Sequence, residues 1–164
     1  MTKAIYAGSF DPFTLGHLDI VNRAALIFDE ITIAISKNTS KNSLFTANEK
    51  LEMIEKVVKK HSPKNVKAIH FSDGLIVDLA KREGANVLLR GIRSSIDMEY
   101  EMNMASANKT QNKEIESIFL MADKKYRFVS SSLVKELAQF NGDLSKMLPV
   151  EIIEAVETKI KLKR

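Results

Sequence analysis

Residues 7–17 read AGSFDPFTLGH and follow a short apolar segment at residues 3–7, KAIYA. A simple reversal of the chain needs only about four residues, and this stretch is far longer. Gly8 permits a tight exit from a strand, or the approach of a ligand to the backbone. Pro12 fixes the turn, and Gly16 lets a helix begin close to a sheet. The stretch therefore predicts the first strand-to-helix connection of the fold.

The rest of the chain alternates strand and helix patterns. Short apolar or β-branched runs predict five strands, at 3–7, 30–36, 66–71, 86–90 and 115–122. Helical spacing predicts helices between them: one carrying Leu18, Val21, Ala25 and Phe28, one opening after Thr46, then 75–83, 96–110, 131–140 and a last helix near Pro149. Strands that are apolar on both faces and alternate with helices predict an α/β fold, a doubly wound, Rossmann-like five-stranded parallel sheet with helices on both faces and a C-terminal helix.

Several helix ends carry recognisable signals. Thr46 and Glu49 form a T-x-x-E capping box, and Ser130 is placed to cap the helix that follows it. Gly84 and Gly142 are expected to end helices.

Composition narrows the function class. The length of 164 residues predicts one domain, and the lack of cysteine excludes disulfides, thiolate catalysis and cysteine zinc sites. Four basic residues in a tail at 159–164 account for the whole formal charge of +4, so no basic face for nucleic acid is expected. The start of the chain does not resemble a signal peptide, and no apolar stretch approaches the roughly 18 residues of a membrane span. We expect a cytoplasmic protein without a membrane partner.

Polar or basic segments follow every predicted strand. They are 7–17, 37–43, 72–74, 90–95 and 122–132. Ligands of such sheets bind beyond the carboxyl ends of the strands, so we expect these segments to meet in one site.

His17 is the most informative residue of the opening stretch. It lies near the first turn of the expected helix, where free N–H groups and the helix dipole favour an anion such as a phosphate. Ser9 and Thr14 add hydroxyl donors. The alternative is that His17 is a helix-start residue bonded only to backbone.

The motifs resemble those of a known family. Gly8-Ser9-Phe10-Asp11-Pro12 with Thr14-Leu15-Gly16-His17 is similar to the signature of the nucleotidyltransferase superfamily that carries a T-x-G-H motif. Further segments resemble the bacterial phosphopantetheine adenylyltransferase family within it: Ser40-Lys41, Leu44-Phe45-Thr46, LRGIR at 89–93, DMEYEM at 97–102 and FVSSSLVKE at 128–136. The resemblance runs from Ile5 to about Ile160.

The resemblance implies transfer of the adenylyl group of ATP to 4′-phosphopantetheine, giving dephospho-coenzyme A and pyrophosphate without a covalent intermediate. It implies Mg²⁺ held by substrate and water, with no protein metal ligand, and a homohexamer. It assigns chemistry to His17, Lys41 and Arg90. It assigns ATP binding to Ser9, Phe10, His17, Gly91, Ile92, Arg93, Glu101, Tyr126, Arg127, Phe128, Val129, Ser130, Ser131 and Ser132. It assigns binding of the second substrate to Ser9, Lys41, Ile76 and Arg90.

Each assignment has an alternative. Lys41 fits a solvated surface charge, and the three serines fit a simple helix cap. Arg90 closes an apolar strand and so needs a partner, which could be structural, such as Glu99 or Glu101. Met98, Met102 and Met104 fit core or subunit contacts, as does Tyr100. A sister adenylyl- or cytidylyltransferase with another phosphorylated acceptor, or a nucleotide-binding module without activity, would share the opening loop.

Overall fold

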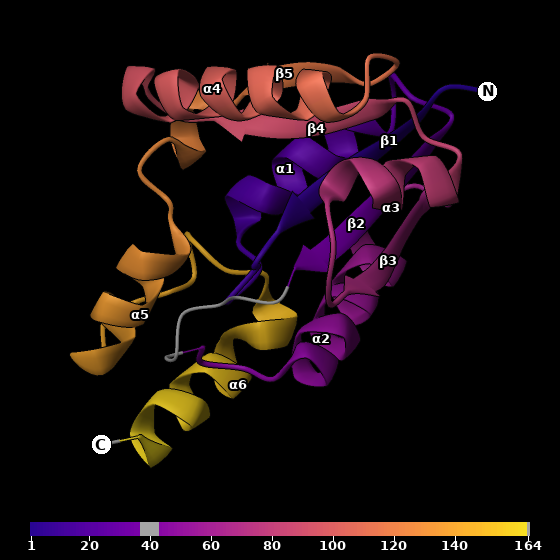
Figure 1. Ribbon diagram of the computed structural model, residues 1–164. Coiled ribbons are helices and arrows are strands. Elements are labelled where there is room, and N and C mark those ends of the chain that lie inside the picture. The colour runs from indigo at the N-terminus through magenta and orange to yellow at the C-terminus, as the bar shows by residue number, and fades with distance from the viewer. Residues whose placement is uncertain (37–42, 164) are drawn as a thin grey trace.

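Five parallel strands form a single sheet in the order β3-β2-β1-β4-β5. The computed structural model describes residues 1–36 and 43–163 (Figure 1). The strands are β1 (Lys3–Gly8), β2 (Glu30–Ser36), β3 (Val66–Phe71), β4 (Val87–Ile92) and β5 (Glu116–Met121). The predicted strands are confirmed, except that β4 continues through Gly91 and Ile92, which had been expected in the loop.

Helices cover both faces of the sheet, as predicted. They are α1 (Leu15–Ala24), α2 (Ala47–His61), α3 (Ile76–Glu83), α4 (Ser95–Gln111), α5 (Ser131–Gln139) and α6 (Val150–Leu162), with a short 3₁₀ turn η1 (Lys124–Tyr126). Figure 1 shows α4 along β4 and β5 at one edge, whereas α6 lies against α2 at the opposite end of the molecule.

Two apolar clusters hold these layers together. Tyr6, Ile33 and Leu89 point to one face, where α1, α2, α5 and α6 complete the larger cluster. Ile5 and Leu88 are their neighbours along the strands and point to the other face, where α3 packs. Successive strand residues point alternately to two faces, and both faces are buried. The strands are therefore apolar at nearly every position.

The predicted helix ends are mostly confirmed. Thr46 and Glu49 form both bonds of the capping box of α2, and Gly84 ends α3 with φ 67°. The helical spacing that includes Ala25 and Phe28 continues past the end of α1 at Ala24, because these two residues of the following turn are buried as well.

The end of α5 involves both Asn141 and Gly142. The left-handed residue is Asn141, with φ 56°, and not Gly142. Gly142 is needed for a different reason: its N–H donates to the Leu137 carbonyl at 2.8 Å, and a Cβ there would lie 3.1 Å from that oxygen.

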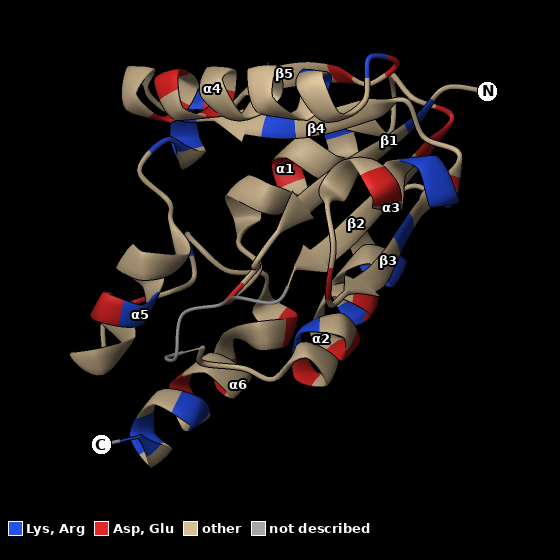
Figure 2. Ribbon diagram, in the orientation of Figure 1, with Lys and Arg blue, Asp and Glu red and all other residues tan. Residues whose placement is uncertain are grey.

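The basic end of the chain is helical as far as Leu162 and contacts the body. Lys159 lies 2.6 Å from Glu49 of α2, and Lys163 donates to the Ser43 carbonyl at 2.9 Å. Figure 2 shows lysine and arginine at the end of α6, and basic and acidic residues intermixed along α2. None of the helices in the described residues is long and apolar enough to cross a membrane.

Candidate active site

A cavity of about 330 Å³ lies at the carboxyl ends of β1 and β4, where α1 and α5 begin. This is the sheet edge at which the segments after the strands were expected to meet. Of the residues predicted for the site, the cavity is lined by Ser9, Phe10, His17, Arg90, Gly91, Arg93, Glu101, Tyr126, Val129, Ser130, Ser131 and Ser132.

The first turn of α1 holds the His17 ring in one orientation. The Thr14 N–H donates to Nδ1 of His17 at 3.0 Å, and the His17 N–H donates to the Thr14 hydroxyl oxygen at 3.3 Å. This is a reciprocal capping box with histidine in the place usually taken by glutamate. Because Nδ1 is the acceptor, the ring proton is on Nε2, which remains as a donor.

The surroundings of His17 keep it neutral. The rings of Phe10 and Phe13 lie 5.1 and 5.5 Å from the imidazole, and the two arginines of the cavity are near. Burial and then the charges of Arg93 and Arg90 lower the pKa of His17 from 6.5 to about 3. His17 is therefore both a helix cap, as the alternative interpretation held, and an uncharged group on the cavity wall.

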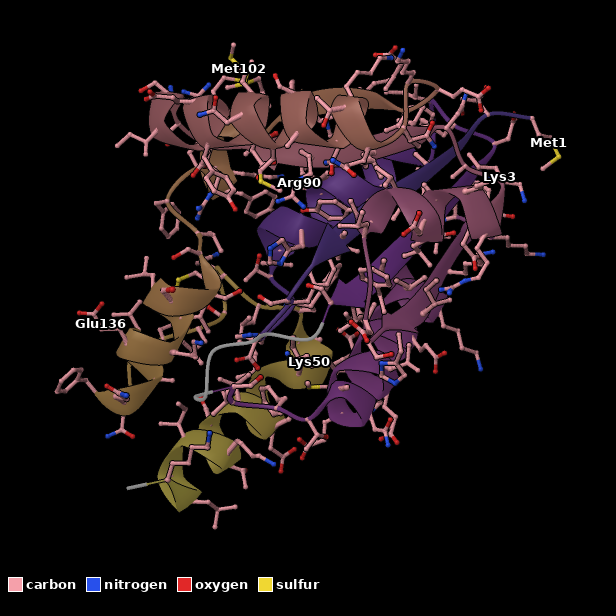
Figure 3. All side chains as sticks on the ribbon, viewed as in Figure 1. Met1, Lys3, Lys50, Arg90, Met102 and Glu136 are labelled. Atoms are coloured by element: carbon pink, nitrogen blue, oxygen red, sulfur yellow. The ribbon has the colours of Figure 1, made fainter. Side chains whose placement is uncertain are left out.

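Arg90 is fixed by three hydrogen bonds. Its Nε and Nη2 donate to the two carboxylate oxygens of Glu101 at 2.7 and 2.6 Å, and Nη1 donates to the Ala7 carbonyl at 2.6 Å. Glu101, and not Glu99, is thus its partner. A guanidinium has five N–H groups, so two form no hydrogen bond with residues 1–36 or 43–163 and can bind an anion such as a phosphate. Figure 3 shows Arg90 beneath α4, in the middle of the molecule.

Arg93 and two of the serines tie the cavity walls together. Arg93 bonds Asp97 at 3.1 Å and the Val129 carbonyl at 3.0 Å. Ser130 caps α5, and the Ser131 hydroxyl donates to the Pro12 carbonyl at 2.7 Å. The serines therefore act as cap and crosslink, and they bring the amino ends of α1 and α5 to one cavity.

Phe10 explains the first glycine of the loop. Its backbone adopts φ 44°, which is unusual for a side-chain-bearing residue, and its ring folds back over Gly8. A Cβ at Gly8 would lie 2.9 Å from the ring, so only glycine fits there.

A second cavity, of about 180 Å³, adjoins the first. Ala7, Arg90 and Glu101 line both. Ile76, predicted for the second substrate, lines this smaller and more apolar cavity.

The sequence analysis missed part of the second cavity. Tyr100 and Met104, interpreted as core or subunit contacts, lie on its wall together with Asn108. The three are spaced by four residues and form one stripe of α4. Met102 falls off that stripe and is 53% exposed, on the outer side of α4 in Figure 3.

Four predicted site residues do not line either cavity or are not described. Ile92 is buried in the sheet, and Arg127 and Phe128 are exposed outside both cavities. Lys41 lies outside the described residues.

The cavity walls suit anions better than cations. The two carboxylates that line the larger cavity, Asp97 and Glu101, are both engaged by arginines. Within residues 1–36 and 43–163, no group of three or more His, Cys, Asp or Glu is arranged to hold a metal ion. These residues therefore do not form a metal cradle of their own.

Known proteins resemble the chain over its length. The model of the cytidylyltransferase-like family matches residues 5–137. A phosphopantetheine adenylyltransferase from Finegoldia magna is 48% identical over 158 residues, 96% of each chain. One from Lachnoclostridium phytofermentans is 46% identical over 164 residues, all of this chain and 99% of the relative. A solved structure of nicotinic acid mononucleotide adenylyltransferase from Plasmodium falciparum has the same fold, with TM-score 0.70 and 16% identity over 99% of this chain and 95% of that one.

Proposed function

The chain belongs to the cytidylyltransferase-like family and, within it, to the phosphopantetheine adenylyltransferases, and from that premise we propose that its two adjoining cavities hold the two substrates. The reaction transfers the adenylyl group of ATP to 4′-phosphopantetheine and releases pyrophosphate, a step in coenzyme A biosynthesis. A phosphate oxygen of the acceptor attacks the α-phosphorus of ATP as the bond from that phosphorus to the bridging oxygen breaks. The attacking phosphate is already ionised at neutral pH, so the step needs no general base.

The sharing of Arg90 by both cavities carries this assignment of substrates. The larger, polar cavity suits a triphosphate and nucleoside. The smaller, apolar one suits the flexible arm of phosphopantetheine along Ile76. A phosphate bound by the two free N–H groups of Arg90 would then stand at the boundary, beside the α-phosphate of ATP.

Catalysis in this arrangement rests on position and charge. The neutral Nε2–H of His17 and the amino ends of α1 and α5 are the donors for the oxygens on which negative charge grows. The two hydrogen bonds that Glu101 accepts from Arg90 fix the orientation of the guanidinium plane. Lys41, from the segment after β2, is proposed as a second contact to the acceptor phosphate.

The remaining expectations stay predictions. Mg²⁺ is proposed to arrive with ATP, held by phosphate oxygens and water, in keeping with the engaged carboxylates of the cavity. A single nucleotidyltransferase domain, a cytoplasmic location and a homohexamer also stay predictions. The exposed Ile96 and Met102 of α4 support a contact between subunits.

An acceptor panel tests the function. The purified protein is incubated with ATP, Mg²⁺ and either 4′-phosphopantetheine, nicotinate mononucleotide or no acceptor, and pyrophosphate and the adenylylated product are measured. We expect turnover with 4′-phosphopantetheine alone. Turnover with nicotinate mononucleotide instead would establish the sister transferase. If no pyrophosphate were released with either acceptor, only a nucleotide-binding module would remain.

The second cavity can be tested with one variant. Ile76→Phe places extra bulk in it and should raise the KM for 4′-phosphopantetheine by about tenfold, equivalent to 1.4 kcal/mol, with the KM for ATP unchanged. The control is Ile27→Phe, since Ile27 is 62% exposed and lines neither cavity. Equal KM values in the two variants would contradict the placement of the acceptor.

A further inference from the structure

Tyr6 is a buried polar residue of the larger cavity that has no part in the mechanism above. It lies in β1, is 6% exposed, and lines the cavity. Its ring packs edge-on against Phe10 at 5.3 Å and lies 6.3 Å from the ring of His17. A phenylalanine would make the same ring contacts, so packing alone does not account for the hydroxyl.

The hydroxyl of Tyr6 reaches across the cavity floor to β4. It stands 3.5 Å from the position that a Cβ of Gly91 would take, beside a residue that lines the same cavity. Among the described residues it donates no hydrogen bond. Because Tyr6 lines the cavity, water accepts this proton when the cavity holds no ligand, and a ligand oxygen that replaces that water can accept the same hydrogen bond.

The charges around this hydroxyl favour an anion. Burial raises the pKa of Tyr6 well above its ordinary value, and so the proton is retained at neutral pH. Arg90 and Arg93 are near enough to act on the phenol electrostatically. The carboxylates of Glu101 and Asp19 act on the phenol as well, but Glu101 is paired with Arg90 and Asp19 with Arg23. The protonated hydroxyl can therefore donate to an anionic oxygen in the cavity.

We propose that the Tyr6 hydroxyl donates a hydrogen bond to a phosphate oxygen of the nucleotide bound in the larger cavity. It adds an uncharged donor on the strand side, opposite the amino ends of α1 and α5. This inference rests on the proposed function only in taking ATP as the occupant of that cavity.

Calorimetric titration with ATP and Mg²⁺ tests the proposal directly, because it does not depend on the acceptor. A hydrogen bond to a charged group changes the affinity by a factor of about ten or more. Tyr6→Phe should therefore raise the dissociation constant for ATP about tenfold and lower kcat/KM for ATP by a similar factor. The free energy of unfolding should not fall, since the hydroxyl donates to no described residue. Tyr6→4-aminophenylalanine, which restores an N–H donor at the same position, should recover part of the affinity.

The outcomes separate this inference from the proposed function. ATP affinity of Tyr6→Phe within about twofold of the wild type overturns the role of Tyr6, as does a loss that appears only in the KM for 4′-phosphopantetheine. If Tyr6→Phe does not fold, the 4-aminophenylalanine variant is compared with Tyr6→Leu instead. The role of Tyr6 is then overturned unless the 4-aminophenylalanine variant folds and binds ATP more tightly than Tyr6→Leu. Failure of the wild type to adenylylate 4′-phosphopantetheine while still binding ATP overturns the proposed function and leaves the Tyr6 comparison intact.

Discussion

The two ring nitrogens of His17 stand in different environments. Nδ1 accepts the Thr14 N–H and closes the first turn of α1, which leaves Nε2–H as the ring's donor. The structural bond thereby fixes the tautomer that the proposed donation to phosphate needs.

Replacement of the imidazole should damage catalysis more than binding. We expect His17→Ala to lower kcat about a hundredfold or more, because a preorganised donor to the reacting phosphate is lost, with a small change in the KM for ATP. The matched control is Thr46→Ala, which removes a comparable cap from α2, away from both cavities. If His17→Ala retained the turnover of the control, the role given to the ring would be wrong.

The protonation state of His17 gives a second prediction. With its pKa lowered from 6.5 to about 3, the ring should stay neutral as the pH falls from 8 to 5, and ¹⁵N NMR should show a proton on Nε2 only. The unfolded chain takes up that proton below pH 6.5 and the folded chain does not. The stability contributed by the neutral ring is therefore complete above pH 6.5 and declines as the pH falls, by up to about 1.4 kcal/mol per unit. A His17 resonance that titrates near pH 6.5 would refute this.

At the scale of elements, the sequence was most informative where local chemistry decides the backbone. Apolar runs located all five strands, and the T-x-x-E pattern located the start of α2. Gly142 closes the end of α5 as predicted, but the sequence did not show that its backbone lies against the Leu137 carbonyl while Asn141 takes the left-handed conformation. Only the fold reveals such a contact.

The candidate site shows the same division. The T-x-G-H motif directed attention to His17, which lies on the wall of the larger cavity, but part of the wall of the second cavity comes from one face of α4. Residues 97, 100, 101, 104, 105 and 108 line a cavity and recur at helical spacing. That spacing separates Glu101 from Glu99 and Met104 from Met102, yet it cannot tell which face meets the sheet until α4 is docked.

The capping box of α2 supplies a prediction at this scale. Thr46→Ala removes the oxygen that accepts the Glu49 N–H, and we expect it to lower the free energy of unfolding by about 1 kcal/mol in urea titration. Thr158→Ala, at an exposed interior position of α6, should be neutral or slightly stabilising because alanine is the better helix former. Equal losses in both variants would show that the cap contributes nothing.

At the scale of the whole molecule, Glu151 joins the C-terminal helix to α2. Its carboxylate accepts from Lys60 at 2.7 Å and from His61 at 2.8 Å, and its side chain is 8% exposed. The hydrogen bond from Lys60, followed by that from His61, lowers the pKa of Glu151 from 4.5 to about 2.

This pKa predicts how the attachment of α6 responds to acid. The unfolded chain protonates Glu151 below pH 4.5 and the folded chain does not, so the stabilisation is complete above pH 4.5 and is lost as the pH falls toward 2. Because Lys60 is 62% exposed and screened by water, Glu151→Gln should cost only about 1 kcal/mol at pH 7, and nothing at pH 2. Glu154→Gln, an exposed residue of the same helix, is the control in urea titrations at both pH values. A cost that did not change with pH would refute the ionic origin.

The histidine cap of α1 restricts how this scaffold can be redesigned. An aliphatic replacement at position 17 would remove both the acceptor of the Thr14 N–H and the proposed donor to phosphate, so the free energy of unfolding has to be measured beside turnover. An amide side chain is the natural compromise, since its oxygen can replace one ring nitrogen and its NH₂ the other. Engineers seeking a new transfer reaction on this sheet would do best to explore position 17 through asparagine and glutamine first.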